Sequence, residues 1–226
     1  MNKCYYCLSP KQETFFWSHL CMSHRLDLLC DACLKEIEWI GPIRCLKCGR
    51  EMDAEGFCAD CTKWKKSTEW GHLLEYNVSF LKYNAFMKEF FAKYKYRGDY
   101  ELAFVLAELI KERMNSLEQV DIICPIPLSN ERLVERGFNQ VEAVLDFLNL
   151  SYEPLLTRQF SEKQAKKGKK ERMELGDIFF IEKQINQQTV LIVDDIYTTG
   201  STIYHAAKVL NEAGASKVFS MTFVRA

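Results

Sequence analysis

Four C-x-x-C pairs crowd the first 61 residues of the chain. A C-x-x-C pair places two thiolates on one tight turn, where both reach a single metal ion at about 2.3 Å, and two such pairs complete a tetrahedral site. Eight cysteines at this spacing therefore predict two zinc ions, each closed by four thiolates and so structural, not catalytic. The eight predicted ligands are Cys4, Cys7, Cys30, Cys33, Cys45, Cys48, Cys58 and Cys61.

Two pairing schemes would use all eight cysteines. Twenty-two residues separate the first and second pairs, and nine separate the third and fourth, with Gly49 and Gly56 near the turns. These spacings are close to those of structural zinc sites built from consecutive pairs, so we favour sequential pairing. The alternative is a cross-braced module, in which the first and third pairs share one ion and the second and fourth share the other.

The composition is that of a soluble globular protein. The chain has 226 residues, 48% of them hydrophobic, with 30 basic and 31 acidic side chains. This length can hold one α/β core and a smaller module, so we expect a zinc-binding domain over residues 1–70 and an α/β domain over residues 71–226. The sequence has neither an export signal nor an apolar run long enough to cross a bilayer, which predicts a cytoplasmic location. The balanced charge excludes a uniformly basic nucleic-acid binder.

From residue 71 onward, segments with helical periodicity alternate with short apolar runs. Apolar residues three or four apart predict helices that face a core, and β-branched runs predict buried strands. A strand, a crossover helix and a further strand predict a mostly parallel sheet with flanking helices. The expected helices are 83–94, 102–110, 138–148 and 199–213, and the expected strands are 120–124, 178–181, 189–193 and 218–224.

The strand expected at 189–193 leads into two acids, Asp194 and Asp195, and then into a turn rich in hydroxyl groups. The N–H groups of such a turn, at the positive end of the next helix, can hold a phosphate. Adjacent carboxylates accept hydrogen bonds from the vicinal hydroxyls of a ribose. The segment therefore predicts a sugar 5-phosphate site; in the plainer alternative, the acids only cap the helix. The predicted phosphate-binding residues are Thr198, Thr199, Gly200, Ser201 and Thr202.

A second anion-binding element is expected after the strand at 120–124. Pro127 and Ser129 lie there in a proline-rich loop, in the place that suits a pyrophosphate. Arg132 and Arg136 follow at a spacing that puts both on one helical face, which suits anionic oxygens of pyrophosphate or DNA. A solvated surface pair is the alternative for the two arginines.

Two basic segments are candidate contacts for single-stranded DNA. Residues 158–172 contain seven basic and two acidic side chains. Residues 82–97 combine five basic with six aromatic side chains, which single strands use for charge and for base stacking. The aromatic residues fall at helical spacing, so we favour a core position for them, and a solvated lid is the alternative for 158–172. The expected DNA or pyrophosphate contacts in the first segment are Lys166, Lys167, Lys169 and Lys170.

The segment that contains Asp194 and Asp195 resembles the phosphoribosyl-pyrophosphate motif of type I phosphoribosyltransferases, in which apolar residues and two acids precede T-T-G-x-T. The resemblance implies a type I phosphoribosyltransferase-like fold, with the two aspartates as the catalytic pair on the ribose hydroxyls. It also implies that Mg²⁺ accompanies phosphoribosyl pyrophosphate in the site.

Other motifs widen the resemblance to nearly the whole chain. With the cysteine pairs, K-Y-R-G-D at 95–99 and R-G-F-N-Q at 136–140, the sequence is similar to the ComF family of late-competence proteins. This implies a cytoplasmic factor that moves transforming single-stranded DNA inward beside a ComFA-like helicase ATPase at the membrane. Three functions stay open: a DNA-uptake adaptor, which we favour because residues 164–178 depart from the family pattern, an active phosphoribosyltransferase, and a sequence-specific regulator of RNA or DNA.

Overall fold

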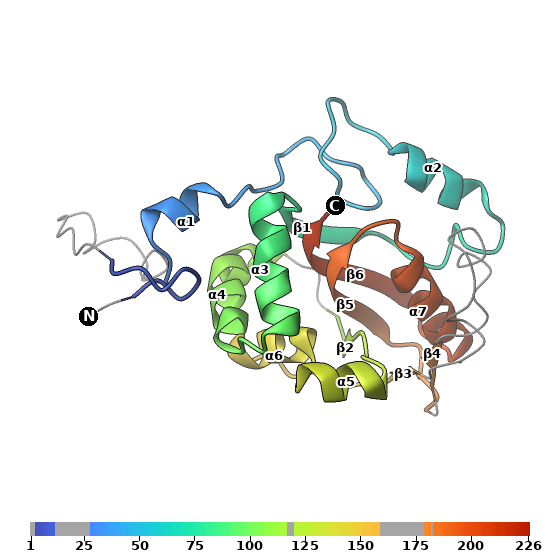
Figure 1. Ribbon diagram of the computed structural model, residues 1–226. Helices are drawn as coiled ribbons and strands as arrows, with labels where there is room; N and C mark the ends of the chain where they lie inside the picture. The colour runs from blue at the N-terminus through green and yellow to red at the C-terminus, as the bar shows by residue number, and fades with distance from the viewer. Residues whose placement is uncertain (1–2, 12–27, 117–119, 159–178, 182) are drawn as a thin grey trace, which may run out of the picture.

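The structure is a computed structural model that describes residues 3–11, 28–116, 120–158, 179–181 and 183–226. At its centre lies a parallel sheet with the strand order β1-β6-β5-β2 (Figure 1). The predicted α/β class, with a mostly parallel sheet and flanking helices, is confirmed. The strands of this sheet are β1 (Asn77–Lys82), β2 (Ile122–Pro125), β5 (Thr189–Tyr197) and β6 (Lys217–Arg225).

The central strands β5 and β6 are largely buried on both faces, because helices cover the sheet on both sides. Their parallel pairing sets Asp194 of β5 beside Thr222 of β6. On the other edge of β5, Val193 lies beside Pro125 of β2. The acids after β5 and the loop after β2 therefore emerge at the same edge of the sheet.

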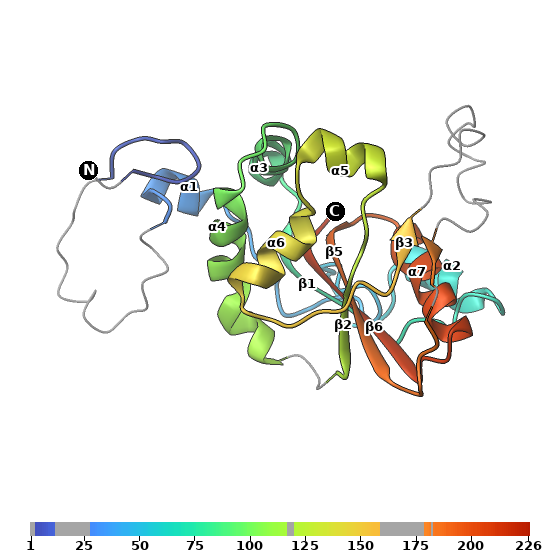
Figure 2. The same cartoon turned by 90° about the horizontal axis from the view of Figure 1, so that it is seen from below.

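Three of the predicted helices cover one face of the sheet: α3 (Ala85–Tyr96), α4 (Glu101–Ile110) and α6 (Gln140–Phe147) (Figure 2). The side chain of Asn84 caps α3 by accepting a hydrogen bond of 2.9 Å from the N–H of Met87. The core position predicted for the aromatic residues of this segment is confirmed for Phe90, Phe91 and Tyr94, which are buried. For Tyr83 and Tyr96, which are exposed, the predicted core position is wrong.

The opposite face is covered by α7 (Ser201–Glu212), which confirms the helix predicted at 199–213. The strand predicted at 178–181 is described only as β4 (Phe179–Phe180), and it pairs antiparallel with β3 (Thr157–Arg158) outside the central sheet. Phe179 is buried while Phe180 is 38% exposed, so this segment has one buried face, whereas a central parallel strand has two. The shorter helices are α1 (Asp31–Lys35), α2 (Ala59–Lys66), α5 (Asn130–Arg136) and the 3₁₀ helix η3 (Lys111–Ser116).

Strand β1 was not expected from the sequence, because two of its inward side chains are polar. Asn77 and Ser79 are both buried. The hydroxyl of Ser79 lies 2.7 Å from that of Thr222, and the hydroxyl of Ser220 donates to Asn77 over 2.9 Å. The strand is therefore held to β6 by a buried polar network whose members lie far apart in the sequence.

The cysteine-rich segment packs against both faces of the sheet. Cys4 and Cys33 join the core formed with α3, α4 and α6, and the four cysteines from Cys45 to Cys61 join the core formed with β5 and α7. A backbone hydrogen bond of 3.0 Å from Ile40 to Phe80 attaches the intervening chain to β1. The division of the chain at residue 70 stays a prediction. Within the described residues, no helix has the length and apolar character needed to span a membrane.

Candidate functional site

The carboxyl ends of β2 and β5 border a pocket of about 340 Å³. In open parallel sheets, ligands bind in the crevice outside these strand ends. The pocket wall carries more basic than acidic side chains, which suits a ligand with several negative charges. The charged residues of the wall are Lys95, Arg132, Arg136, Arg158, Asp194 and Asp195.

The acid pair lies within β5, which extends to Tyr197, beyond its expected end at residue 193. The N–H of Asp195 donates to the carboxylate of Asp194 over 2.8 Å. The Asp195 carboxylate forms an ion pair with the ammonium group of Lys95 on α3, and both side chains are largely buried. One acid is therefore paired with a cation from the helical layer, while the other is held by the strand backbone.

Burial, followed by the neighbouring charge of Asp195, raises the pKa of Asp194 to about 7. The backbone N–H of Asp195, Lys95 and Arg158 act in the opposite direction. A carboxyl group with such a pKa gains and loses its proton near neutral pH. It can therefore accept a proton from a ligand, or lose its own proton when a cation binds.

The turn after β5 contains the five predicted phosphate-binding residues. Thr198 and Thr202 line the pocket, and Thr199, Gly200 and Ser201 complete the turn between them. Gly200 has a φ of +88°, in the left-handed region that favours glycine, and it is the N-cap of α7. Glycine offers no side chain to the first-turn N–H groups of α7, which an anion could therefore reach, although the N–H of Ser201 donates to the Thr199 hydroxyl over 3.4 Å.

A Cβ atom at Gly200 would come within 2.3 Å of the Tyr197 hydroxyl oxygen. Tyr197 is buried beneath the turn. The turn therefore depends on glycine both for its backbone conformation and for its close approach to the tyrosine ring.

On the opposite wall, Pro127 lines the pocket as predicted. Ser129 lies just outside the wall, where it is buried and caps α5 by accepting a hydrogen bond of 3.4 Å from the N–H of Arg132. Arg132 and Arg136 both line the pocket. Arg136 also donates to the side-chain oxygen of Gln140 over 2.8 Å. Both arginines of the predicted pair therefore face the same space as the acids.

Sequence reasoning did not assign Lys95 or Asn139 to this pocket and named Arg158 only as part of the basic segment 158–172, although the structure places all three in the pocket wall. Burial, followed by the neighbouring charge of Arg132, lowers the pKa of Arg158. Asn139 caps α6 and donates to the carbonyl of Ile126 over 3.1 Å. Lys95 opens the K-Y-R-G-D segment and Asn139 lies in R-G-F-N-Q, so these segments already contained the signal. The four lysines expected to contact DNA or pyrophosphate, Lys166, Lys167, Lys169 and Lys170, fall outside the described residues.

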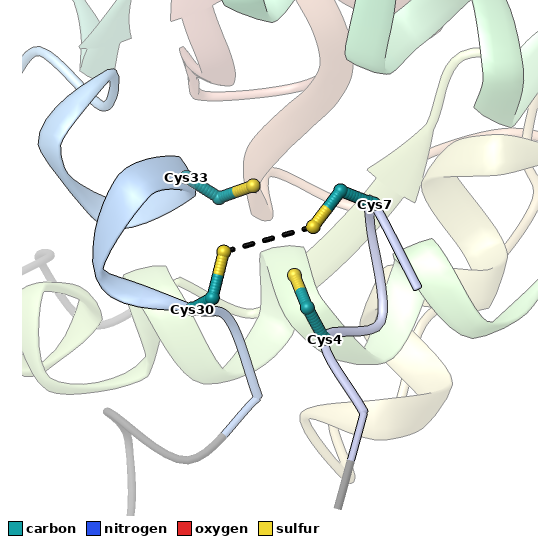
Figure 3. Close-up of side chains that lie close together, drawn as sticks. All are labelled: Cys4, Cys7, Cys30 and Cys33. Atoms are coloured by element: carbon teal, nitrogen blue, oxygen red, sulfur yellow. Dashed lines mark hydrogen bonds between the residues drawn. The ribbon is translucent and has the colours of Figure 1, made fainter. Parts of the chain in front are cut away.

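The cysteine thiols gather into two clusters, and the sequential pairing scheme is confirmed. In the first cluster, Cys4, Cys7, Cys30 and Cys33 converge on a common centre (Figure 3). Their sulfur atoms lie within 4.8 Å of one another, and those of Cys7 and Cys30 are 3.6 Å apart. The ring of Tyr6, between the first two ligands, stacks on Phe90 of α3 at 5.7 Å. The first cluster is therefore anchored to the helical layer.

The second cluster consists of Cys45, Cys48, Cys58 and Cys61, all buried and within the same 4.8 Å of one another. The N–H of Cys58 donates to the Cys45 sulfur over 3.3 Å. A hydrogen bond from Cys61 and the nearby Arg225 guanidinium lower the pKa of the Cys48 thiol to about 4. Four close sulfur atoms with N–H donors around them fit a tetrahedral site of the Cys4 type, as zinc prefers.

Comparisons with known proteins agree with this architecture. A family model described as the phosphoribosyl transferase domain matches residues 104–226. The chain is 33% identical to competence protein ComFC of Bacillus subtilis (strain 168), over 98% of this chain and 94% of the relative. It is 33% identical to competence protein ComFC of Streptococcus pneumoniae, over 99% of this chain and 100% of the relative. DNA utilization protein YhgH of Escherichia coli (strain K12) is 28% identical over 52% of this chain and 58% of the relative.

Proposed function

This chain belongs to the ComF family of competence proteins, and we propose that it acts in the uptake of transforming single-stranded DNA through a site that binds phosphoribosyl pyrophosphate. Its relatives are named for competence and for DNA utilization, which supports the role in DNA uptake. In this proposal the protein works in the cytoplasm beside a ComFA-like helicase ATPase at the inner face of the membrane.

The observation that carries the ligand assignment is the meeting of the acid pair, the glycine turn and four basic side chains in one pocket. The turn and the start of α7 would hold the 5-phosphate, and Asp194 and Asp195 would accept hydrogen bonds from the ribose hydroxyls. The arginines on the opposite wall would bind the pyrophosphate oxygens. The acid pair would also hold Mg²⁺, which supplies positive charge against the pyrophosphate.

The two cysteine clusters would each hold a structural zinc ion. Four thiolates leave no open coordination position, which supports a structural role. For DNA, we assign the contact to residues 158–172, because the aromatic face of α3 is occupied by the core and one of its lysines, Lys95, faces the pocket. In this proposal the cysteine-rich segment contacts a partner.

Calorimetry of the full-length protein with phosphoribosyl pyrophosphate and Mg²⁺ tests the ligand. We expect saturable binding by the wild type and loss of binding in Asp194→Ala/Asp195→Ala. Asp53→Ala, at an exposed acid of the second cysteine segment, is the matched control and should bind like the wild type. Absence of binding by the zinc-loaded wild type would contradict the proposal.

The DNA-uptake role is tested in a naturally transformable host whose own family member has been deleted. The wild-type gene should restore transformation, and the double aspartate variant should not, although it accumulates to the same level. Equal restoration of transformation by both genes would show that DNA uptake does not require the acid pair of the pocket.

Phosphoribosyl transfer is the second candidate, favoured by the pKa of Asp194 near 7. In that reaction a nucleobase nitrogen forms a bond to the anomeric carbon, the bond from that carbon to pyrophosphate breaks, and pyrophosphate leaves with the electron pair. In this candidate reaction Asp194 would take the proton released by the nitrogen. Pyrophosphate release across a panel of nucleobases, absent in Asp194→Asn, would favour the enzyme over the adaptor.

A further inference from the structure

Arg225, the last residue of β6, lies between the second cysteine cluster and the phosphate turn. It is buried, with an exposed fraction of 4%. Its guanidinium donates to the Cys48 sulfur over 3.4 Å on one side. On the other side it donates to the carbonyls of Tyr197 and Thr198 over 3.0 and 2.9 Å. One side chain therefore bonds to a candidate metal ligand and to the start of the turn.

A second side chain makes a parallel connection. The indole N–H of Trp64 donates to the carbonyl of Thr199 over 3.0 Å. Trp64 lies on α2, the helix that also carries Cys61, and its ring stacks on Tyr204 of α7 at 4.1 Å. Arg225 and Trp64 thus hold the turn at three successive carbonyls, and the Trp64 ring also holds the following helix by stacking.

These contacts fix the direction of the peptide groups in the turn. In a planar trans peptide, the C=O of one residue and the N–H of the next point in opposite directions. With the carbonyls of Tyr197, Thr198 and Thr199 turned toward Arg225 and Trp64, the N–H groups that follow them point to the other side of the turn. An array of N–H groups held in one direction is what an anion-binding turn requires.

We propose that the second cysteine cluster is the platform of the phosphate turn, and that Arg225 is the positioning residue that couples metal binding there to sugar phosphate binding. This inference rests on the proposed function. The first cluster differs, because the described contacts of Tyr6, between two of its ligands, go to Phe86, Phe90 and Lys93 of α3. The two metal sites therefore have different roles: the first secures the helical layer, and the second shapes the ligand site.

The first test measures affinity for ribose 5-phosphate, which occupies the turn without needing a pyrophosphate site. Arg225→Met should weaken binding about tenfold or more, since it removes charged hydrogen bonds that orient the turn, and Arg225→Lys should restore part of the loss. Arg50→Met is the matched control. Arg50 lies between Cys48 and Cys58 of the second cluster, but its side chain forms a surface ion pair with Asp60 at 3.0 Å. Wild-type affinity in a folded, zinc-loaded Arg225→Met protein would overturn the coupling.

A second variant keeps the test decisive if Arg225→Met does not fold. Trp64→Phe retains an aromatic ring against Tyr204 and loses the N–H that holds Thr199. It should weaken ribose 5-phosphate severalfold while zinc content stays at the wild-type value. Unchanged affinity in this variant would count against the platform.

A spectroscopic readout follows the metal itself. Protein loaded with ¹¹³Cd should give one NMR signal for each cluster. Ribose 5-phosphate should shift one signal, and Arg225→Lys should reduce that shift, because coupling between two sites acts in both directions. If neither signal moves at saturating ligand, the proposal is wrong.

Hydrogen exchange separates the failure of this inference from the failure of the proposed function. Without any ligand, chelation of the metal should speed amide exchange in residues 198–202. If that acceleration occurs but the wild type binds no sugar phosphate, the platform stands and the ligand assignment falls. If the wild type binds its ligand and the rate of amide exchange at 198–202 does not change when the metal is removed, the platform falls and the ligand assignment stands.

Discussion

Lys95 of α3 is ion-paired with Asp195 of β5, so a cation fixed to the protein already contacts the acid pair of the pocket. The lysine side chain is only 16% exposed, and its ammonium group also lies 5.2 Å from the centre of the Phe91 ring. Charge at a site this secluded is weakly screened by salt. The carboxylates can therefore be kept close together without a metal, which distinguishes them from an exposed acidic cluster.

Removal of this cation should make ligand binding more dependent on magnesium. In Lys95→Met, the two carboxylates repel each other with less compensation, so phosphoribosyl pyrophosphate should bind severalfold more weakly without Mg²⁺ and recover as Mg²⁺ is added. Calorimetric titrations at several Mg²⁺ concentrations measure this. Lys88→Met changes an exposed lysine of the same helix and should follow the wild-type curve. Identical magnesium curves for Lys95→Met and Lys88→Met would contradict the expectation.

The raised pKa of Asp194 predicts how stability depends on pH. Between the ordinary carboxyl value near 4 and about 7, the unfolded chain has lost this proton while the folded chain keeps it. The contribution of this group to the free energy of unfolding therefore falls as pH rises through that interval. Asp194→Asn should be more stable than the wild type at pH 8, with the difference shrinking toward pH 5.

Urea unfolding of the two proteins at a series of pH values measures the difference. Asp53→Asn, at an exposed position, controls for the loss of one negative charge. A stability difference between Asp194→Asn and wild type that does not vary with pH would show that Asp194 titrates normally in the folded protein.

Gly200→Ala should lower the free energy of unfolding for two separable reasons. A left-handed φ costs a residue with a Cβ about 1–2 kcal/mol, and contact with the Tyr197 hydroxyl should add about 1–3 kcal/mol. Gly98→Ala is the matched control, because Gly98 has a φ of +65° but open space around its Cβ position. Chemical unfolding of both variants isolates the steric part, and equal losses of stability would exclude the close contact with Tyr197.

Zinc content should follow the cysteine clusters one ion at a time. Native mass spectrometry should find two zinc ions in the wild type and one in a folded variant that lacks a ligand, such as Cys7→Ser. Cys124→Ser is the control, since Cys124 is buried but lies outside both clusters. Two ions in Cys7→Ser would remove that residue from the ligand set.

The sequence was most informative where one local pattern decides the structure. The mostly β-branched, apolar run before Asp194, followed by the turn at Gly200, predicted β5, the turn and α7. The spacing of the cysteine pairs favoured the sequential clusters, because each cluster closes through short connections. The apolar spacing in residues 82–97 likewise indicated that the aromatic face of α3 belongs to the core.

Features that depend on distant partners were not predictable from local patterns. In the sequence, Asn77 and Ser79 interrupt the apolar pattern of a strand. Only the folded structure shows that Thr222 of β6 completes their hydrogen-bond network. Lys95 and Arg158 were recognisable as basic residues, but only the fold brings them to the acids. No periodicity relates Cys48 to Arg225, whose contact spans 177 positions of the chain.

That separation has a consequence for how the protein is assembled. The ligands of the second cluster lie close together in the sequence, so a metal can gather them at little entropic expense, whereas the Cys48–Arg225 contact must close a very long loop and waits for the final strand. The supply of metal during synthesis would then decide whether the second cysteine cluster has formed before β6 packs against it. Cells short of zinc would accumulate chains whose sheet has folded but whose phosphate turn is not held in its binding conformation.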